Sequence, residues 1–261
     1  MQIRLNPVTL ISGAGSGIGA ACAHELARRS HGGLVLADAD DNALGLLADE
    51  LDANGASPER VSTLAFDAAA PERWAQAIAF VQSQYGRLDW AVVNPSPHAG
   101  QQASDSGLVE WGKAATAQLE SAIRALNAIM AIMAKNTQGG AIVLTAPAAA
   151  LRQEPAPADA APGLLQVMRA AAQEGAHANV RINAIAPGGV KTPMWDAMPW
   201  FQDLVRETGG ESAAFNKISQ MSAPVARYAQ AGDVTRLISM LLTDEAPVTG
   251  ATLVVDGGYT L

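Results

Sequence analysis

Short apolar runs alternate along the chain with longer stretches in which apolar residues recur at helical spacing. The runs predict strands at Val8–Ser12, Leu34–Ala37, Val61–Phe66, Trp90–Asn94, Ala141–Leu144, Arg181–Ala186 and Thr252–Val255. The longer stretches predict helices at Ala20–Arg29, Asp41–Asn54, Pro71–Tyr85, Val109–Lys135, Gly163–Ala176 and Asp233–Leu242. Most runs are apolar throughout, which is typical of parallel strands covered by helices on both faces. We therefore expect a single α/β domain over residues 1–261, a doubly wound parallel sheet.

The composition indicates a compact protein with an acidic surface. Apolar residues make up 49% of the chain, charged residues 16%, and the formal net charge is -8. Such a surface repels phosphate backbones and anionic lipid, so we expect neither a nucleic-acid nor a membrane partner. The single cysteine, Cys22, is interpreted as a small core residue and suits a reducing compartment. We expect a cytoplasmic protein without a signal peptide, and no spacing of residues predicts a metal site.

A glycine-rich turn joins the first predicted strand to the first helix. Ser12–Ala20 reads SGAGSGIGA, in which the glycines permit close approach to a pyrophosphate and the helix N-terminus supplies N–H groups. Asp38 ends the second strand, about 20 residues further on, where an acid accepts hydrogen bonds from ribose hydroxyls. A carboxylate there repels a 2′-phosphate and favours NAD(H) over NADP. The alternative role for Asp38 is to cap the following helix. Together the two features predict a Rossmann-like dinucleotide site.

Further motifs, in the same order along the chain, resemble those of the short-chain dehydrogenase/reductase family. The family's T-G-x-x-x-G-x-G corresponds to Ser12–Gly19, its acid after the third strand to Asp67, and its N-N-A-G to Asn94–Pro97, where only the first asparagine is kept. Its P-G-x-V-x-T-P corresponds to Pro187–Pro193, and its closing V-D-G-G is found within Thr249–Gly258. The resemblance extends over essentially the whole chain and implies an NAD(P)-dependent oxidoreductase fold.

The resemblance also implies which residues bind the cofactor. Asp67 would lie beside the adenine, and Val190 and Thr192 would contact the nicotinamide carboxamide. The full expected set is Gly13, Gly15, Ser16, Gly17, Ile18, Gly19, Asp38, Asp67, Ala68, Asn94, Pro187, Gly188, Val190 and Thr192.

The residues that usually carry the family's chemistry are replaced in this chain. In the family a tyrosine exchanges a proton with the substrate oxygen, a lysine lowers the pKa of that tyrosine, a serine orients the substrate, and an asparagine assists a proton relay. The equivalent positions here are Gln118 for asparagine, Pro147 for serine, Ala160 for tyrosine and Leu164 for lysine. Because the chain has no serine between Ser121 and Ser212 and no tyrosine between Tyr85 and Tyr228, no shift of alignment restores the set.

This replacement leaves three hypotheses open. The first is an NAD(H)-binding protein that is catalytically impaired or non-catalytic and works beside an active relative. The second is a dehydrogenase or reductase that acts on a hydrophobic alcohol or ketone through displaced acid–base groups, which are His98, Asp159 or an ordered water. The simpler roles of these two residues are a solvated loop histidine and a helix cap. The third treats the cofactor site itself as vestigial. Other polar residues near the expected mouth are Thr145, Arg152, Glu154 and Lys191.

The segment over residues 194–229 lies, by the same resemblance, where the family folds a lid over the substrate. Its apolar residues suit either a hydrophobic ligand or packing against the body or a neighbouring subunit; they are Met194, Trp195, Met198, Trp200 and Phe201. The replaced positions Pro147, Ala160 and Leu164 would add an apolar pocket floor. Alanine- and methionine-rich faces on Thr116–Met133 and Leu164–Ala172, together with the resemblance, imply a homodimer or homotetramer.

Overall fold

A seven-stranded parallel sheet forms the centre of the computed structural model, which describes residues 6–95, 107–151, 161–225, 227–243 and 247–261. The strand order is β3-β2-β1-β4-β5-β6-β9. The strands are β1 (Thr9–Ser12), β2 (Leu34–Asp38), β3 (Val61–Ala65), β4 (Trp90–Val93), β5 (Gly140–Thr145), β6 (Val180–Pro187) and β9 (Thr252–Val255). This order confirms the predicted doubly wound α/β fold.

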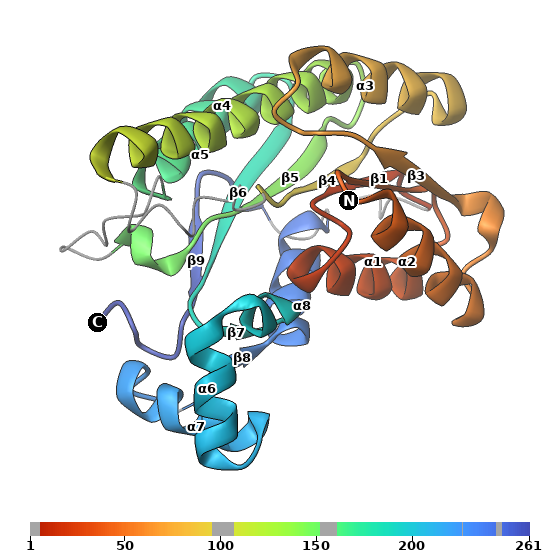
Figure 1. Ribbon diagram of the computed structural model, residues 1–261. Coiled ribbons are helices and arrows are strands. Elements are labelled where there is room, and N and C mark those ends of the chain that lie inside the picture. The colour runs from red at the N-terminus through yellow and green to blue at the C-terminus, as the bar shows by residue number, and fades with distance from the viewer. Residues whose placement is uncertain (1–5, 96–106, 152–160, 226, 244–246) are drawn as a thin grey trace.

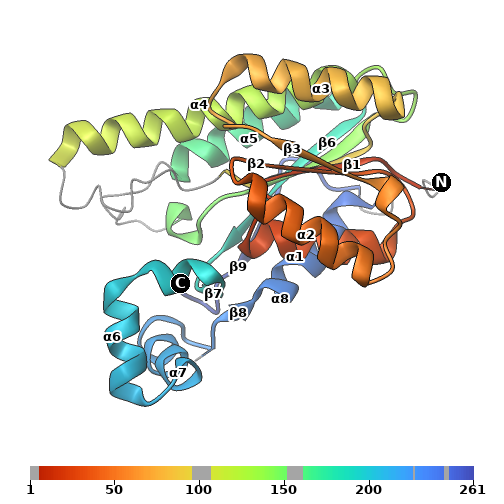
Figure 2. The ribbon, with the colours of Figure 1, turned by 45° about the vertical axis from the view of Figure 1, so that its right-hand side comes forward.

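Helices cover both faces of the sheet, as Figures 1 and 2 show. One layer holds α3 (Pro71–Tyr85), α4 (Gly107–Met133) and α5 (Ala161–Ala176), and the other holds α1 (Gly17–Arg29), α2 (Asp41–Ala53) and α8 (Ala231–Leu242). The first helix begins at Gly17 rather than at the predicted Ala20, because the glycine turn runs directly into the helix.

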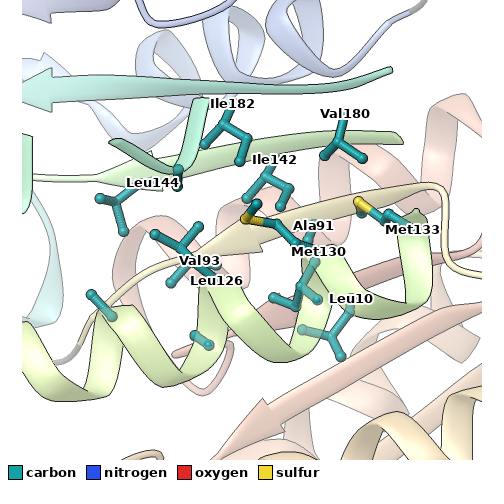
Figure 3. Packing of buried hydrophobic residues seen from close by; sticks show 14 of the residues in the cluster. Leu10, Ala91, Val93, Leu126, Met130, Met133, Ile142, Leu144, Val180 and Ile182 are labelled. Carbon is teal, nitrogen blue, oxygen red and sulfur yellow. The ribbon is translucent and has the colours of Figure 1, made fainter. Parts of the chain in front are cut away.

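The apolar strands are explained by this burial on two faces. Every residue of β1, β4 and β5 is buried, so neither face of these strands requires polar side chains. Figure 3 shows Leu126, Met130 and Met133 of α4 directed toward Ile142 and other apolar residues of the sheet. Cys22 is buried in α1, and burial raises the pKa of its thiol, which agrees with a core role.

The segment over residues 194–229 holds structure that the sequence pattern does not predict. It contains a 3₁₀ turn (Pro193–Ala197), α6 (Pro199–Thr208) and α7 (Glu211–Ser222), which project from one end of the sheet (Figure 1). Gly209 ends α6 in the left-handed conformation, at φ +80°, and so separates α6 from α7. Two short strands, β7 (Val190–Lys191) and β8 (Ala229–Gln230), pair at the base of this segment.

The strand order reverses next to β1, and this reversal positions the site. β1 pairs with β2 on one side and with β4 on the other, and the helices that follow β1 and β4, α1 and α4, cover opposite faces of the sheet. A crevice at such a point is the usual ligand site of open α/β sheets. The glycine turn, Asp38 and Asn94 all follow strands that end there.

The packing predicts that two Leu→Ala substitutions lower the free energy of unfolding by very different amounts. Leu126→Ala removes a side chain that is 1% exposed and should lower the free energy of unfolding by about 2–5 kcal/mol, because it leaves a cavity between α4 and the sheet. The control, Leu46→Ala on α2, alters a side chain that is 66% exposed and should change stability by about 0.5 kcal/mol or less. Urea denaturation measures both, and equal losses would contradict the assigned core.

Candidate cofactor and active site

The glycine turn after β1 is packed so closely that it admits no side chain at two positions. A Cβ on Gly19 would overlap the carbonyl oxygen of Gly13, and a Cβ on Gly13 would overlap the carbonyl oxygen of Asn94. Gly13 also has φ +65°, a left-handed conformation that glycine adopts without strain. The turn therefore brings backbone, rather than side chains, to the crevice.

The N-terminus of α1 follows this turn and faces a second predicted motif. Ser16 is the N-cap, and its side chain forms no capping hydrogen bond within the described part of the chain. The first N–H groups of the helix and its dipole therefore suit an anionic group such as a pyrophosphate. A Cβ built on Gly17 would lie 3.5 Å from Cγ2 of Thr192, so the two motifs meet across the crevice. Ile18, by contrast, packs against the core on the side of α1.

Asp38 is fixed at the end of β2 by two backbone donors. The N–H of Gly15 donates to Oδ2 of Asp38 at 2.8 Å, and the N–H of Asp40 donates to Oδ1 at 3.1 Å. The helix-capping alternative for Asp38 is wrong, because Asp40 is the N-cap of α2 and accepts a hydrogen bond from the N–H of Ala43 at 3.0 Å. The carboxylate of Asp38 is thus attached to the glycine turn and lines the crevice.

A pocket opens at this crevice and gathers several predicted residues. Gly13, Asp38, Asp67, Ala68 and Asn94 all line it. The sequence reading missed other lining residues, which come from the end of β3, from α3 and from α4: Phe66, Trp74, Ser121, Ala122 and Ala125. No motif marks these positions, and only the packing of α3 and α4 over the sheet brings them there.

Asn94 connects the ends of three strands. Its Nδ2 donates to the carbonyl oxygen of Gly13 at 3.3 Å, and its Oδ1 accepts from the hydroxyl of Thr145 at 2.5 Å. The hydroxyl proton of Thr145 is therefore engaged within the sheet edge and does not point to a substrate. Thr145 is read as a structural residue.

The other half of the crevice is formed by the segment after β6. Gly188 donates its N–H to the carbonyl oxygen of Val255 at 3.0 Å, and Val190 is buried while pairing with Ala229. The indole Nε1 of Trp195 donates to the carbonyl oxygen of Val190 at 2.7 Å. These bonds hold the Pro187–Pro193 motif between the central sheet and the segment over residues 194–229, which is called the lid segment below.

The closing V-D-G-G motif supports this same segment. Asp256 accepts hydrogen bonds from the N–H of Gly258 at 2.8 Å and from both the N–H and the hydroxyl of Thr260, at 2.9 and 2.7 Å. Burial opposes ionisation of the Asp256 carboxyl, but these hydrogen bonds outweigh it and hold its pKa below the ordinary value. A Cβ on Gly188 would lie 2.7 Å from Cβ of Asp256, so the two motifs are in close contact.

The lid segment has an aromatic core centred on Trp195. Its ring lies 5.3 to 5.8 Å, between centroids, from four others, which are Trp200, Phe201, Phe215 and Tyr228. The apolar cluster expected from the sequence is divided: Phe201 is fully buried and Met198 packs against it, whereas Met194 and Trp200 are exposed. Lys191 places its Nζ 5.0 Å from the centre of the Phe215 ring, in a cation–π contact.

Three of the four positions expected to match the family's catalytic set lie on different elements of the described structure. Gln118 is half-buried on α4, and Pro147 is exposed after β5. The expectation that Leu164 forms a pocket floor is wrong, because its side chain is fully buried in the core between α5 and the sheet. His98, Arg152, Glu154, Asp159 and Ala160 lie outside the described residues. Among the described residues, no group of three or more histidine, cysteine or carboxylate side chains is arranged to hold a metal ion.

The sequence of this chain matches a family of oxidoreductases. A family model described as "Enoyl-(Acyl carrier protein) reductase" matches residues 13–260. The chain belongs to the short-chain dehydrogenase/reductase family. Within the described residues, none of the helices combines the length and apolarity that crossing a membrane requires.

Individual relatives cover nearly the full chain. Cyclohexanol dehydrogenase of Acinetobacter sp. (strain SE19) is 32% identical, over 98% of this chain and 95% of the relative. Trans-4-hydroxycyclohexanecarboxylate dehydrogenase of Sinomonas cyclohexanicum is 30% identical, over 97% and 92%. L-sorbose reductase of Gluconobacter frateurii, solved as a complex with NADPH and L-sorbose, has a TM-score of 0.84 at 25% identity, over 98% of this chain and 97% of that chain.

The close packing of the turn predicts that one added methyl group prevents dinucleotide binding. Gly19→Ala would force Gly13 away from its position. The affinity for NAD⁺ should fall about tenfold or more, which corresponds to a loss of about 1.4 kcal/mol or more in binding free energy. Gly45→Ala on α2 is the matched control, since its Cβ would meet nothing within 4 Å. Calorimetric titration of both folded variants measures the effect, and equal affinities would show that the turn does not hold the cofactor.

Proposed function

We propose that this chain binds NAD(H) at the glycine turn and transfers hydride between the nicotinamide and a hydrophobic alcohol or ketone. The observation that carries the proposal is the carboxylate of Asp38, held by the N–H of Gly15 at the edge of the crevice. An acid at the end of the second strand accepts hydrogen bonds from the adenosine ribose. NAD(H), when bound, supplies or accepts the hydride. Names of relatives that are dehydrogenases or reductases support turnover over a purely binding role.

The preference for NAD(H) over NADP(H) rests on charge. Asp38 would lie within hydrogen-bond reach of the ribose 2′-hydroxyl, and a phosphate in its place would put two negative groups side by side. The neighbouring residue, Ala39, offers no positive charge in compensation. L-sorbose reductase was solved with NADPH, so the preference that we propose for this chain depends on the local carboxylate of Asp38.

The proton in this proposal is carried by a group other than the usual tyrosine and lysine. Gln118, Pro147, Ala160 and Leu164 occupy the four equivalent positions, and none of them titrates near neutral pH. General acid–base assistance is worth about 10²–10⁴-fold in rate, so an active family member requires a substitute. In the sequence, His98 comes after β4 and Asp159 comes before α5, and these two residues are the candidates that we propose.

The class of substrate is proposed from the relatives and from the lid. Two relatives are named for cyclohexanol and for a hydroxycyclohexanecarboxylate, both of which are cyclic secondary alcohols. The aromatic lid segment lies beside the Pro187–Pro193 motif, which is proposed to contact the nicotinamide, and it suits a substrate with an apolar ring. Met194 and Trp200 are exposed on the lid segment. Cyclic secondary alcohols and the corresponding ketones are therefore the substrates to test first. We further propose a cytoplasmic homodimer or homotetramer.

A second candidate function is an NAD(H)-responsive binding protein without turnover, working beside an active relative. The observation that favours it is the burial of Leu164, which leaves no polar atom where the family places the lysine that holds the nicotinamide ribose. Thr145 offers no substitute, because its hydroxyl donates to Asn94. The two candidates share the cofactor site and differ only in turnover.

Asp38 predicts a selective effect on the choice of cofactor. Asp38→Ala should weaken NAD⁺ binding about ten- to a hundredfold, the equivalent of a lost hydrogen bond to a charged group, and should weaken NADP⁺ binding much less. Asp49→Ala, which removes an exposed carboxylate further along α2, should leave both affinities unchanged. Isothermal titration with the two dinucleotides gives the ratio, and an unaltered NAD⁺ preference in Asp38→Ala would refute the role of this carboxylate.

Turnover decides between the two candidate functions. Wild-type protein with cyclohexanol and NAD⁺, or with cyclohexanone and NADH, should change absorbance at the NADH band. His98→Ala or Asp159→Ala should reduce that rate about 10²-fold or more while NAD⁺ affinity stays the same. His31→Ala serves as a control on an exposed histidine distant from the crevice. If NAD⁺ binds but cyclic and acyclic alcohols and ketones all give no turnover, the binding-protein candidate is correct.

A further inference from the structure

Two consecutive carbonyl groups in the loop after β3 are held by side chains from α3 and α4. The carbonyl oxygen of Ala68 accepts from the indole Nε1 of Trp74 at 2.9 Å and from the hydroxyl of Ser121 at 3.2 Å. The carbonyl oxygen of Ala69 accepts from Nη1 of Arg124 at 2.6 Å. The loop itself reads Asp67-Ala-Ala-Ala and has no long side chain with which to anchor its backbone.

These three donors are well placed and partly fixed themselves. The ring of Trp74 packs edge-on against Phe66, with centroids 5.3 Å apart, and the guanidinium of Arg124 also pairs with Glu120 one turn away, at 2.8 Å. Ser121 lies 53 residues from Ala68 in the chain, so α4 contributes directly to the geometry of a distant loop.

The loop borders the adenosine half of the proposed cofactor site. A dinucleotide lies across the reversal point of the sheet, with one nucleotide over each half. Asp38 assigns the β1–β3 half to the adenosine, and Asp67 and Ala68 line the same pocket as Asp38. The inference drawn from this loop therefore rests on the proposed NAD(H) binding.

The orientation of one peptide group connects the donors to the pocket. In a trans peptide the carbonyl of one residue and the N–H of the next point in opposite directions. With the carbonyl of Ala68 turned toward Trp74 and Ser121, the N–H of Ala69 points the other way and donates to Oδ1 of Asp67 at 2.9 Å. Holding the Ala68 carbonyl thus orients the carboxylate of Asp67.

We propose that Trp74, Ser121 and Arg124 are positioning residues that set the affinity of the pocket for adenine. The family resemblance implies that Asp67 lies beside the adenine, where its carboxylate would accept a hydrogen bond from the exocyclic amino group. The orientation of this carboxylate depends on the peptide that the three side chains hold. Trp74 and Ser121 also line the pocket, but their polar atoms donate to the carbonyl of Ala68, so they act on the adenine through the backbone of the loop.

The chain offers a matched pair of tryptophans for the test. Trp74→Phe keeps an aromatic ring against Phe66 and removes the N–H that holds Ala68, together with part of the buried ring. Trp90 is buried at the start of β4, and its indole nitrogen has no hydrogen-bond partner among the described residues. Trp90→Phe therefore removes a buried N–H that holds no loop.

Calorimetric titration with NAD⁺ and with nicotinamide hypoxanthine dinucleotide, which lacks the amino group, separates positioning from general destabilisation. Trp74→Phe should weaken NAD⁺ about three- to tenfold, in the range of one net hydrogen bond, and the hypoxanthine analogue by less than about twofold. Trp90→Phe should change neither by more than about twofold. Ser121→Ala should repeat the Trp74→Phe pattern and provides the test if Trp74→Phe does not fold.

The possible results are distinguishable. Unchanged NAD⁺ affinity in Trp74→Phe and Ser121→Ala, or an equal loss for both dinucleotides, overturns the positioning role and leaves NAD(H) binding intact. A wild-type chain that binds neither dinucleotide overturns the proposed function and the positioning role with it. Selective loss for NAD⁺ supports both.

Discussion

The hydrogen bond between the N–H of Gly15 and the carboxylate of Asp38 connects the two structural features on which the proposed function depends. One is the glycine turn, whose packing excludes side chains from the crevice. The other is the end of β2, which the doubly wound sheet places beside that turn. Because the bond joins them, the position for a pyrophosphate and the position for a ribose are fixed relative to each other. Elements other than the glycine turn form the rest of each half of the crevice.

The two halves of the crevice are supported in different ways. On the adenosine side, α3 and α4 hold the loop after β3 through Trp74 and Ser121. On the nicotinamide side, the lid holds the segment after β6 through Trp195 and its aromatic neighbours. The family resemblance implies that the proton transfer takes place on this second side, with Pro147 and Leu164 at two of the positions concerned. In the proposed function, the family's motifs bind the cofactor, and a group other than the usual tyrosine and lysine carries the proton.

The sequence predicts the sheet because its strands are apolar on both faces, and it predicts Asp38 because the acid follows the glycine turn at a defined spacing. The helices of the lid were missed because α6 and α7 bury only a small core of their own, in which Phe201 and Phe215 are the large residues. The sequence does not predict the role of Ser121, because its hydrogen bond joins residues 53 positions apart in the chain. It does not predict the role of Trp74, because no motif marks that position. The expectation that Leu164 lines a pocket is wrong because an alignment assigns a residue to a position and does not show how deeply its side chain is buried.

The most direct test of the account is a crystal structure of the protein soaked with NAD⁺. We expect the adenosine ribose hydroxyls within hydrogen-bond distance of the Asp38 carboxylate and the pyrophosphate against the N-terminus of α1. A dinucleotide bound with its ribose away from Asp38, or crystals that take up no dinucleotide at saturating concentration, would contradict it.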